Sequence, residues 1–195
     1  MSTVETNLVQ PSTGTTLTLG ASGDTVDVPS GATLDVTGAT VSGLSAGKVL
    51  QVVTLQYSTI ETHSAGSSWQ NTGLSLAITP ASTSNKILVV ITASISASTY
   101  GFHNVVRDST ALNQGTATGS RIACTASSYG GSSAALPTAS ITLLDSPSTT
   151  SATTYLLAVY GYNSETVYLN RTSTDADGNY TARGSSSITL MEIEG

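Results

Sequence analysis

The residues with the most obvious capacity for chemistry form the short segment Asp175-Ala176-Asp177-Gly178-Asn179. Its carboxylates alternate around a glycine, and calcium loops place hard oxygen ligands at every second position in the same way. The bidentate glutamate of an EF-hand does not follow, and no helical pattern flanks the segment. Two interpretations stay open, a weak calcium site or a solvated Asp/Asn/Gly turn.

Nucleophilic catalysis would need a histidine placed beside a serine or cysteine. His63 and His103 are the only histidines, and neither has a second histidine at ligand spacing. Serine is abundant, but residue types without a placed geometry do not establish a Ser-His-Asp triad. Cys124 is the only cysteine, and its alanine neighbours indicate a small buried residue rather than a reactive thiol. We therefore expect no catalytic residue, no cofactor and no metal.

Aromatic rings in loops are candidates for stacking on sugars, because a ring presents a flat apolar face. Trp69 is the only tryptophan, and Tyr129 and Tyr180 also fall in or near predicted loops. The alternative is that each ring packs over an end of the β-structure. The candidates for contact with a receptor are therefore Trp69, Tyr129, Asp175, Asp177 and Tyr180.

The composition limits the partners of the chain. Charged residues make up 9% of it, the net charge is −6, and the six cations are scattered, so we expect no nucleic-acid binding. No run of about 18 apolar residues is present, so we expect no membrane insertion. Residues 1–10 lack the basic and apolar regions of a signal peptide. These features favour a protein that is made in a cytoplasm and reaches the outside as part of a particle.

The elements that must position the candidate residues are strands. Thr, Val, Ile, Ser and Tyr alternate between Gly, Pro and Asn punctuation, and this pattern predicts an all-β chain. Several short strands at such spacing predict an antiparallel sandwich or jelly roll over residues 47–195. The expected strands are 49–57, 74–78, 87–95, a hairpin of 105–106 with 111–112, 121–125, 140–144, 155–160, 166–170 and 187–193.

The N-terminal third has a weaker repeat of apolar pairs. Pairs such as Leu17 with Leu19 and Val26 with Val28 recur about every eight or nine residues, with turn formers between them. One such unit buries side chains worth about 2–4 kcal/mol, which is less than the cost of ordering its backbone. Three chains wound together could supply the missing contacts, so we predict a trimeric β-stalk over residues 14–46. A flexible Ser/Thr/Gly linker is the alternative. Residues 1–13 are the expected segment for attachment to a particle.

Two predicted strands are apolar on both faces, whereas a sandwich strand of a monomer normally has one polar face. They are Lys86–Ile91 and Tyr155–Tyr160. A neighbouring subunit or a covering loop would bury the second face. We favour the subunit, and the candidate trimer-interface residues are Leu88, Val90, Tyr155, Leu157 and Val159.

Residues 47–195 resemble the C-terminal domain of many marine and cyanobacterial phage tail-fibre or structural proteins. That domain is similar to the C1q/tumour-necrosis-factor jelly roll, which forms compact trimers. The resemblance implies virion location and trimerisation, and it implies no catalytic residue. Its most specific parts are Thr79–Ile87 and Ile188–Ile193. The other matching stretches are Gly47–Val53, Leu144–Pro147 and Thr153–Tyr155.

We therefore expect a non-enzymatic phage fibre or appendage protein. Its expected partners are two further copies of itself, other virion proteins bound through the N-terminal segment, and a host cell-surface glycan. One alternative is a structural protein that decorates the capsid or braces a neck or tail joint. Another is a glycan depolymerase, which would need a pair of carboxylates a few ångströms apart. No such pair stands out among the twelve Asp and Glu residues.

Overall fold

The computed structural model describes residues 11, 13–16, 18–19, 21, 24–33, 35, 48–64 and 68–195. The chain divides into two units, Met1–Leu44 and Ser45–Gly195. The sequence pattern had placed the change from stalk to head after residue 46.

The described part of the N-terminal unit contains turns and no strand. The turn expected at Pro29-Ser30-Gly31 is confirmed: the Ala32 N–H donates to the Pro29 carbonyl at 3.0 Å, and Gly31 has φ = 87°. Leu19, Val26 and Val28 are exposed in the single chain. Most of the attachment segment and residues 36–46 lie outside the described residues. The β-stalk therefore stays a prediction.

The second unit is built from strands alone, apart from one short 3₁₀ turn within the described residues. Every strand pair is antiparallel. The elements are β1 (Val49–Tyr57), β2 (Glu61–Ser64), β3 (Gln70–Ile78), β4 (Lys86–Ala97), β5 (Tyr100–Arg107), β6 (Thr110–Leu112), β7 (Ala126–Tyr129), β8 (Thr138–Asp145), β9 (Thr153–Gly161), η1 (Tyr162–Ser164), β10 (Thr166–Leu169) and β11 (Ser186–Ile193).

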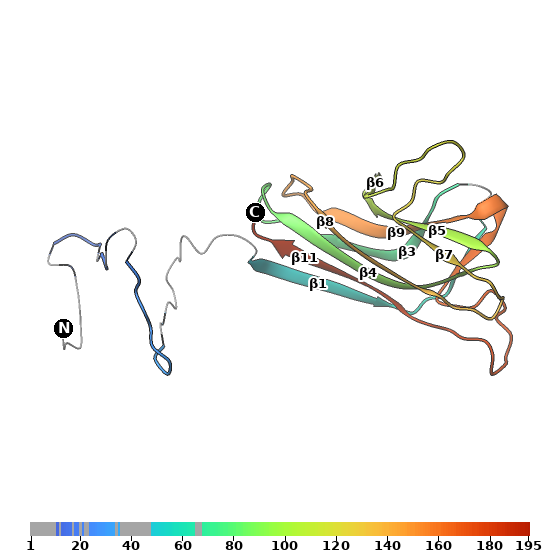
Figure 1. Cartoon of the computed structure of the whole chain (residues 1–195), viewed down its shortest axis with the longest axis horizontal. Coiled ribbons are helices and arrows are strands. Elements are labelled where there is room, and N and C mark those ends of the chain that lie inside the picture. The colour runs from blue at the N-terminus through green and yellow to red at the C-terminus, as the bar shows by residue number, and fades with distance from the viewer. Residues whose placement is uncertain are drawn as a thin grey trace. The chain divides into compact units, whose positions relative to one another are not determined.

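These strands form two sheets packed face to face in a jelly-roll-like sandwich (Figure 1). The first sheet runs β1-β11-β4-β8, and β10 and β2 continue it along the far end of β4. The second sheet runs β3-β9-β5, with β6 and β7 both paired to β5. The all-β sandwich expected from the sequence is therefore confirmed.

The core lies between the sheets because alternate side chains of each strand point inward. From β4 the inward set includes Ile87, Val89 and Ile91, all fully buried. From β9 it includes Tyr155 and Leu157, also fully buried. Each such side chain stabilises the fold by about 1.5–3 kcal/mol relative to an exposed position, so these two central strands anchor the sandwich.

Most of the expected strands are present, and one expectation is wrong. Residues 121–125 form no strand, and the next strand along the chain is β7, which pairs with the first half of β5. Cys124 lies in the connection before it, where its carbonyl accepts a single hydrogen bond from the Gly115 N–H at 3.1 Å. The sequence pattern also missed β2 and β7, since each has four residues, mostly polar.

A buried carboxylate joins the two most specific sequence stretches. Glu192, in β11, is fully buried and accepts hydrogen bonds from the Asn85 amide at 2.6 Å and the Ala81 N–H at 2.7 Å. The Gln51 amide of β1 donates to its other oxygen at 2.6 Å. Burial alone would raise the pKa of Glu192, but these hydrogen bonds outweigh it and lower the pKa below its usual value. We call these four residues, Gln51, Ala81, Asn85 and Glu192, the Glu192 clasp.

Replacing the Glu192 carboxylate tests the clasp. Glu192→Ala takes the acceptor from three donors, of which the Asn85 amide is buried, so we expect it to lower the free energy of unfolding by about 3 kcal/mol. Glu192→Gln keeps one acceptor oxygen, and we expect roughly half that loss. Urea denaturation at fixed protein concentration measures both, with Glu194→Ala, two residues further on, as the control. Equal stability of the Glu192→Ala and Glu194→Ala chains would contradict a structural role for the clasp.

Candidate functional site

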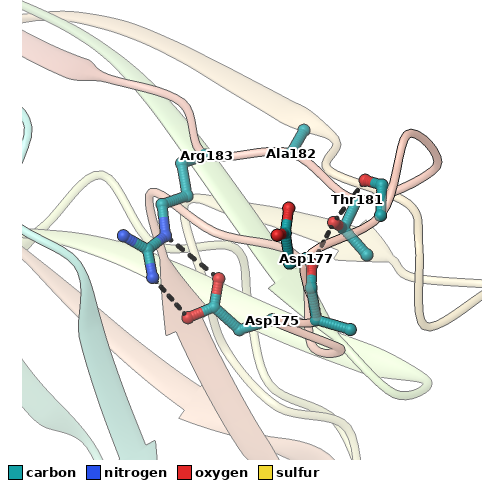
Figure 2. A pocket seen from close by; sticks show the side chains of 7 residues that line it. Asp175, Asp177, Thr181, Ala182 and Arg183 are labelled. Carbon is teal, nitrogen blue, oxygen red and sulfur yellow. Dashed lines mark hydrogen bonds and ion pairs between the residues drawn. The ribbon is translucent and has the colours of Figure 1, made fainter.

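The candidate calcium segment lies in the loop between β10 and β11, where it lines a pocket of about 390 Å³. Arg183 donates two hydrogen bonds to the Asp175 carboxylate, at 3.1 and 2.9 Å, and Figure 2 shows this pair across the loop. Arg171 also forms an ion pair with Asp175, at 3.6 Å. The hydrogen bonds from Arg183 lower the pKa of Asp175. The negative charge of Asp175 is thus already balanced by two guanidinium groups.

This geometry favours the turn interpretation over the calcium interpretation. Calcium takes six to eight oxygen ligands, and an ion here would first have to displace Arg183. Among the described residues no group of three or more His, Cys, Asp and Glu side chains is placed to hold a metal. Asp177 lines the same pocket, whereas the Tyr180 ring is 63% exposed outside its lining. The structure therefore brings together Asp175 and Asp177 but not an aromatic face for a sugar.

His103 offers the nearest approach to a catalytic pair. It lies on β5 facing the core, is fully buried, and its Nε2 is 3.0 Å from the Ser128 hydroxyl of β7. Its Nδ1 has no hydrogen-bond partner among the described residues, so the carboxylate that completes a triad is missing from this pair. Burial lowers the pKa of His103 to about 4.

The other two candidate reactive side chains have ordinary structural surroundings. His63 lies beside Glu61 in β2, with its Nε2 2.6 Å from a carboxylate oxygen, and the Tyr57 hydroxyl donates to the other oxygen. Cys124 is half-buried, and burial raises the pKa of its thiol. A raised pKa disfavours the thiolate, which is the reactive form.

The outer face of the first sheet carries an unbroken line of apolar side chains. Strand pairing sets Val52 of β1 opposite Met191 of β11, Met191 opposite Leu88 of β4, and Leu88 opposite Leu144 of β8. We call these four residues the apolar row. Val52 and Leu144 are each 54% exposed, while Leu88 and Met191 are half-buried. The row is therefore a partly exposed apolar surface that a partner protein could bury.

Of the five residues expected at a trimer interface, two lie on this outer face. Leu88 belongs to the apolar row, and Val90 lies beside it, half-buried in the next row between threonines. The other three, Tyr155, Leu157 and Val159, are fully buried inside one chain, so a second chain cannot contact them.

The second face of β9 has a covering residue within the same chain. Its outward residues Leu156 and Ala158 are buried in a small cluster with Val106 of β5, against which Trp69 packs. The sequence offered a subunit or a covering loop for this face, and for β9 the cover is Trp69, just before β3. The period of two places Tyr155, Leu157 and Val159 on the opposite, core-facing side.

Trp69 and Tyr129 both lie on the outer face of the second sheet. The Trp69 ring contacts Tyr160 of β9, with centroids 5.6 Å apart, and Tyr129 contacts Tyr100 of β5 at 5.1 Å. Trp69 also lines a groove of about 530 Å³ on this face. The polar residues of that groove were missed from the sequence, because they come from separate strands and turns and share no motif.

No protein-family model matches the chain, and no curated protein matches it either. In the part of the chain that the structure describes, no helix is long and apolar enough to cross a membrane.

The buried His103 should make stability depend on pH. Its folded-state pKa of about 4 lies below the ordinary 6.5, so the unfolded chain binds the proton first as the pH falls. The stabilisation is complete above pH 6.5 and is lost progressively towards pH 4, by about 3 kcal/mol in all.

Unfolding free energies at pH 7 and pH 4.5 measure this loss. We expect a smaller difference between the two pH values in His103→Leu than in the unaltered chain, since the variant has no imidazole to protonate there. The account fails if His103→Leu and the unaltered chain lose the same stability on acidification.

Proposed function

We propose that this chain is a non-enzymatic subunit of a bacteriophage virion fibre or appendage, that three copies associate, and that the sandwich is presented to a host surface. The observation that carries the proposal is the apolar row on the outer face of β1-β11-β4-β8. Four apolar side chains in register across four strands resemble the centre of a subunit interface more than a solvated sheet face.

The threonines around the row support the same interpretation. Thr54 and Thr189 form the adjacent line, with their hydroxyl groups 3.0 Å apart, so their hydrogen bonds are made within the sheet. Hydroxyls paired in this way can be covered by a partner without leaving a donor unpaired. A sheet face of apolar and paired hydroxyl groups suits a permanent contact between identical chains.

The N-terminal unit provides a second line of support. Leu19, Val26 and Val28 are exposed by 62%, 60% and 42% in the single chain. Their burial would require further chains, and a shared axis gives three copies of each pair per layer. The number three and the virion location follow from the resemblance of residues 47–195 to phage fibre domains.

The described pockets also favour a structural and binding role over hydrolysis. A glycosidase needs one carboxyl group whose pKa is raised so that it can act as an acid. In the loop pocket the pKa of Asp175 is shifted in the opposite direction, downward, by Arg183. The groove beside Trp69 has a single carboxylate in its described lining, Asp108. Asp175, held ionised by Arg183, is therefore unsuited to the role of the acid, and the groove has no second carboxylate in its described lining.

The mass of the purified chain in solution tests the assembly. We expect light scattering to give three times the 19.7 kDa of the single chain. Val52→Asp and Leu144→Asp place a charge on residues that are more than half exposed in one chain, so the fold should tolerate them. In the assembly the same charge would be buried, which costs several kcal/mol.

We therefore expect either variant to weaken association by about 100-fold or more, which corresponds to about 3 kcal/mol. Ala77→Asp provides a matched control, because Ala77 is an exposed apolar residue of β3 in the other sheet. A monodisperse monomer of the unaltered chain would refute the proposal. So would a trimer that both row variants leave intact.

A further inference from the structure

The outer face of the second sheet gathers most of the aromatic residues of the chain. The sequence has one Trp, one Phe and eight Tyr residues. Six of these ten form two sets of ring contacts on this face, at centroid separations of 5.1 to 6.0 Å. One set is Trp69, Tyr160 and Phe102, and the other is Tyr129, Tyr100 and Tyr162.

The two sets form one continuous surface. Tyr100 and Phe102 are two residues apart on β5, so they point to the same side of the sheet about 7 Å apart. Tyr129, Tyr100 and Tyr162 are exposed by 61%, 49% and 51%. Core packing accounts for a buried ring, but it does not account for three neighbouring rings that are each half exposed. We call the six rings the aromatic platform.

The groove begins where the platform meets Trp69. Its polar lining comes from three amide side chains, one carboxylate and one serine, supplied by Asn71 of β3, Asn104 of β5, Asp108 and Ser109 of the β5–β6 turn, and Gln114 after β6. An amide offers two donors and an acceptor, and a carboxylate offers acceptors only. Together they match the vicinal hydroxyl groups of a sugar, each of which donates and accepts. The amides belong to Asn71, Asn104 and Gln114, and the carboxylate belongs to Asp108.

These polar groups are held in place before any ligand arrives. The Thr125 N–H donates to Asn104 Oδ1 at 3.0 Å, and this bond fixes the buried Asn104 amide in the wall of the groove. The Thr154 N–H donates to Asp108 Oδ1 at 2.9 Å and fixes that carboxylate at the turn. A site whose side chains are already ordered loses less entropy when it binds.

The charge of the groove selects among sugars. None of the described residues that line it is Lys or Arg, and the one charged residue is Asp108. A sulfated, phosphorylated or sialylated glycan would meet a carboxylate and no cation. A neutral pyranose meets no such repulsion, and its C–H face can stack on the negative face of an aromatic ring.

We infer that the groove beside Trp69 and the aromatic platform together form a binding site for a neutral glycan, one sugar in the groove and further sugars along the platform. The lone carboxylate in its lining makes this a binding site without hydrolysis. Binding at one site needs only a single chain. The gain in avidity from several sites rests on the proposed trimer.

Trp69 makes the test direct, because it is the only tryptophan of the chain and its fluorescence reports on the groove. The full chain is first applied to an array of immobilised glycans, neutral hexose and N-acetylhexosamine oligosaccharides beside sialylated and sulfated ones. Soluble oligosaccharides of the bound neutral type are then titrated while Trp69 emission is recorded. We expect binding to neutral glycans and a saturable change in emission.

Variants then locate the site. Asn71→Ala and Tyr129→Ala change an exposed amide of the groove and an exposed ring of the platform, and we expect each to weaken glycan binding by 10-fold or more. Tyr180→Ala, an equally exposed tyrosine in the β10–β11 loop, should bind as the unaltered chain does. Trp69→Phe, which keeps a ring, should weaken binding less than Trp69→Ala.

The outcomes separate this inference from the proposed assembly. Three outcomes would overturn the site: binding to no neutral glycan, binding to acidic glycans alone, or binding by the Asn71→Ala and Tyr129→Ala chains as tight as that of the unaltered chain. A monomeric chain whose Trp69 emission still responds to a soluble neutral glycan would support the site while refuting the trimer. A trimer without any response would do the reverse.

Discussion

Every strand of the sandwich has two faces, and the core between the sheets can bury only one of them. In an ordinary soluble domain the other face is polar. Here the outer face of β1-β11-β4-β8 carries the apolar row, and the outer face of β3-β9-β5-β7 carries the aromatic platform. The two outer faces of a sandwich point away from each other. One face can therefore join subunits while the other meets a ligand, and neither use obstructs the other.

The position of the apolar row depends on strand register, and the Glu192 clasp holds that register at one end. Glu192 follows Met191 in β11, so the buried carboxylate points inward where the row residue points outward. Gln51 bonds to Glu192 from β1 and precedes Val52 of the row in the same way. A slip of one residue would bury Met191 and expose the carboxylate. The clasp thus joins Thr79–Ile87 to Ile188–Ile193, the two stretches that are most specific in the sequence. By holding the register of β11, it also keeps Met191 on the outer face.

Period-two patterns made the sandwich predictable, and the same patterns left its surfaces uncertain. Alternation in β3 and the long apolar runs of β4 and β9 located those strands from the sequence. Two apolar faces on β9 could not be assigned from the sequence, because the cover, Trp69, is about ninety residues away along the chain. Asn104 and Gln114 gave no signal, since isolated amides are common and only the fold brings them to one groove. Asp175 was a candidate calcium ligand in the sequence, but in the structure its carboxylate accepts hydrogen bonds from Arg183.

The most direct measurement of this division between faces is hydroxyl-radical footprinting of the chain in solution, read by mass spectrometry. Met191 is half-buried in one chain and oxidises readily where water reaches it, and Tyr100, Tyr129 and Tyr162 report on the opposite face. The account predicts that Met191 is protected in the assembled chain and becomes oxidised when Val52→Asp separates the subunits, while the three tyrosines are oxidised in both. Oxidation of Met191 at the same rate in both chains, or protection of the tyrosines on assembly, would contradict it.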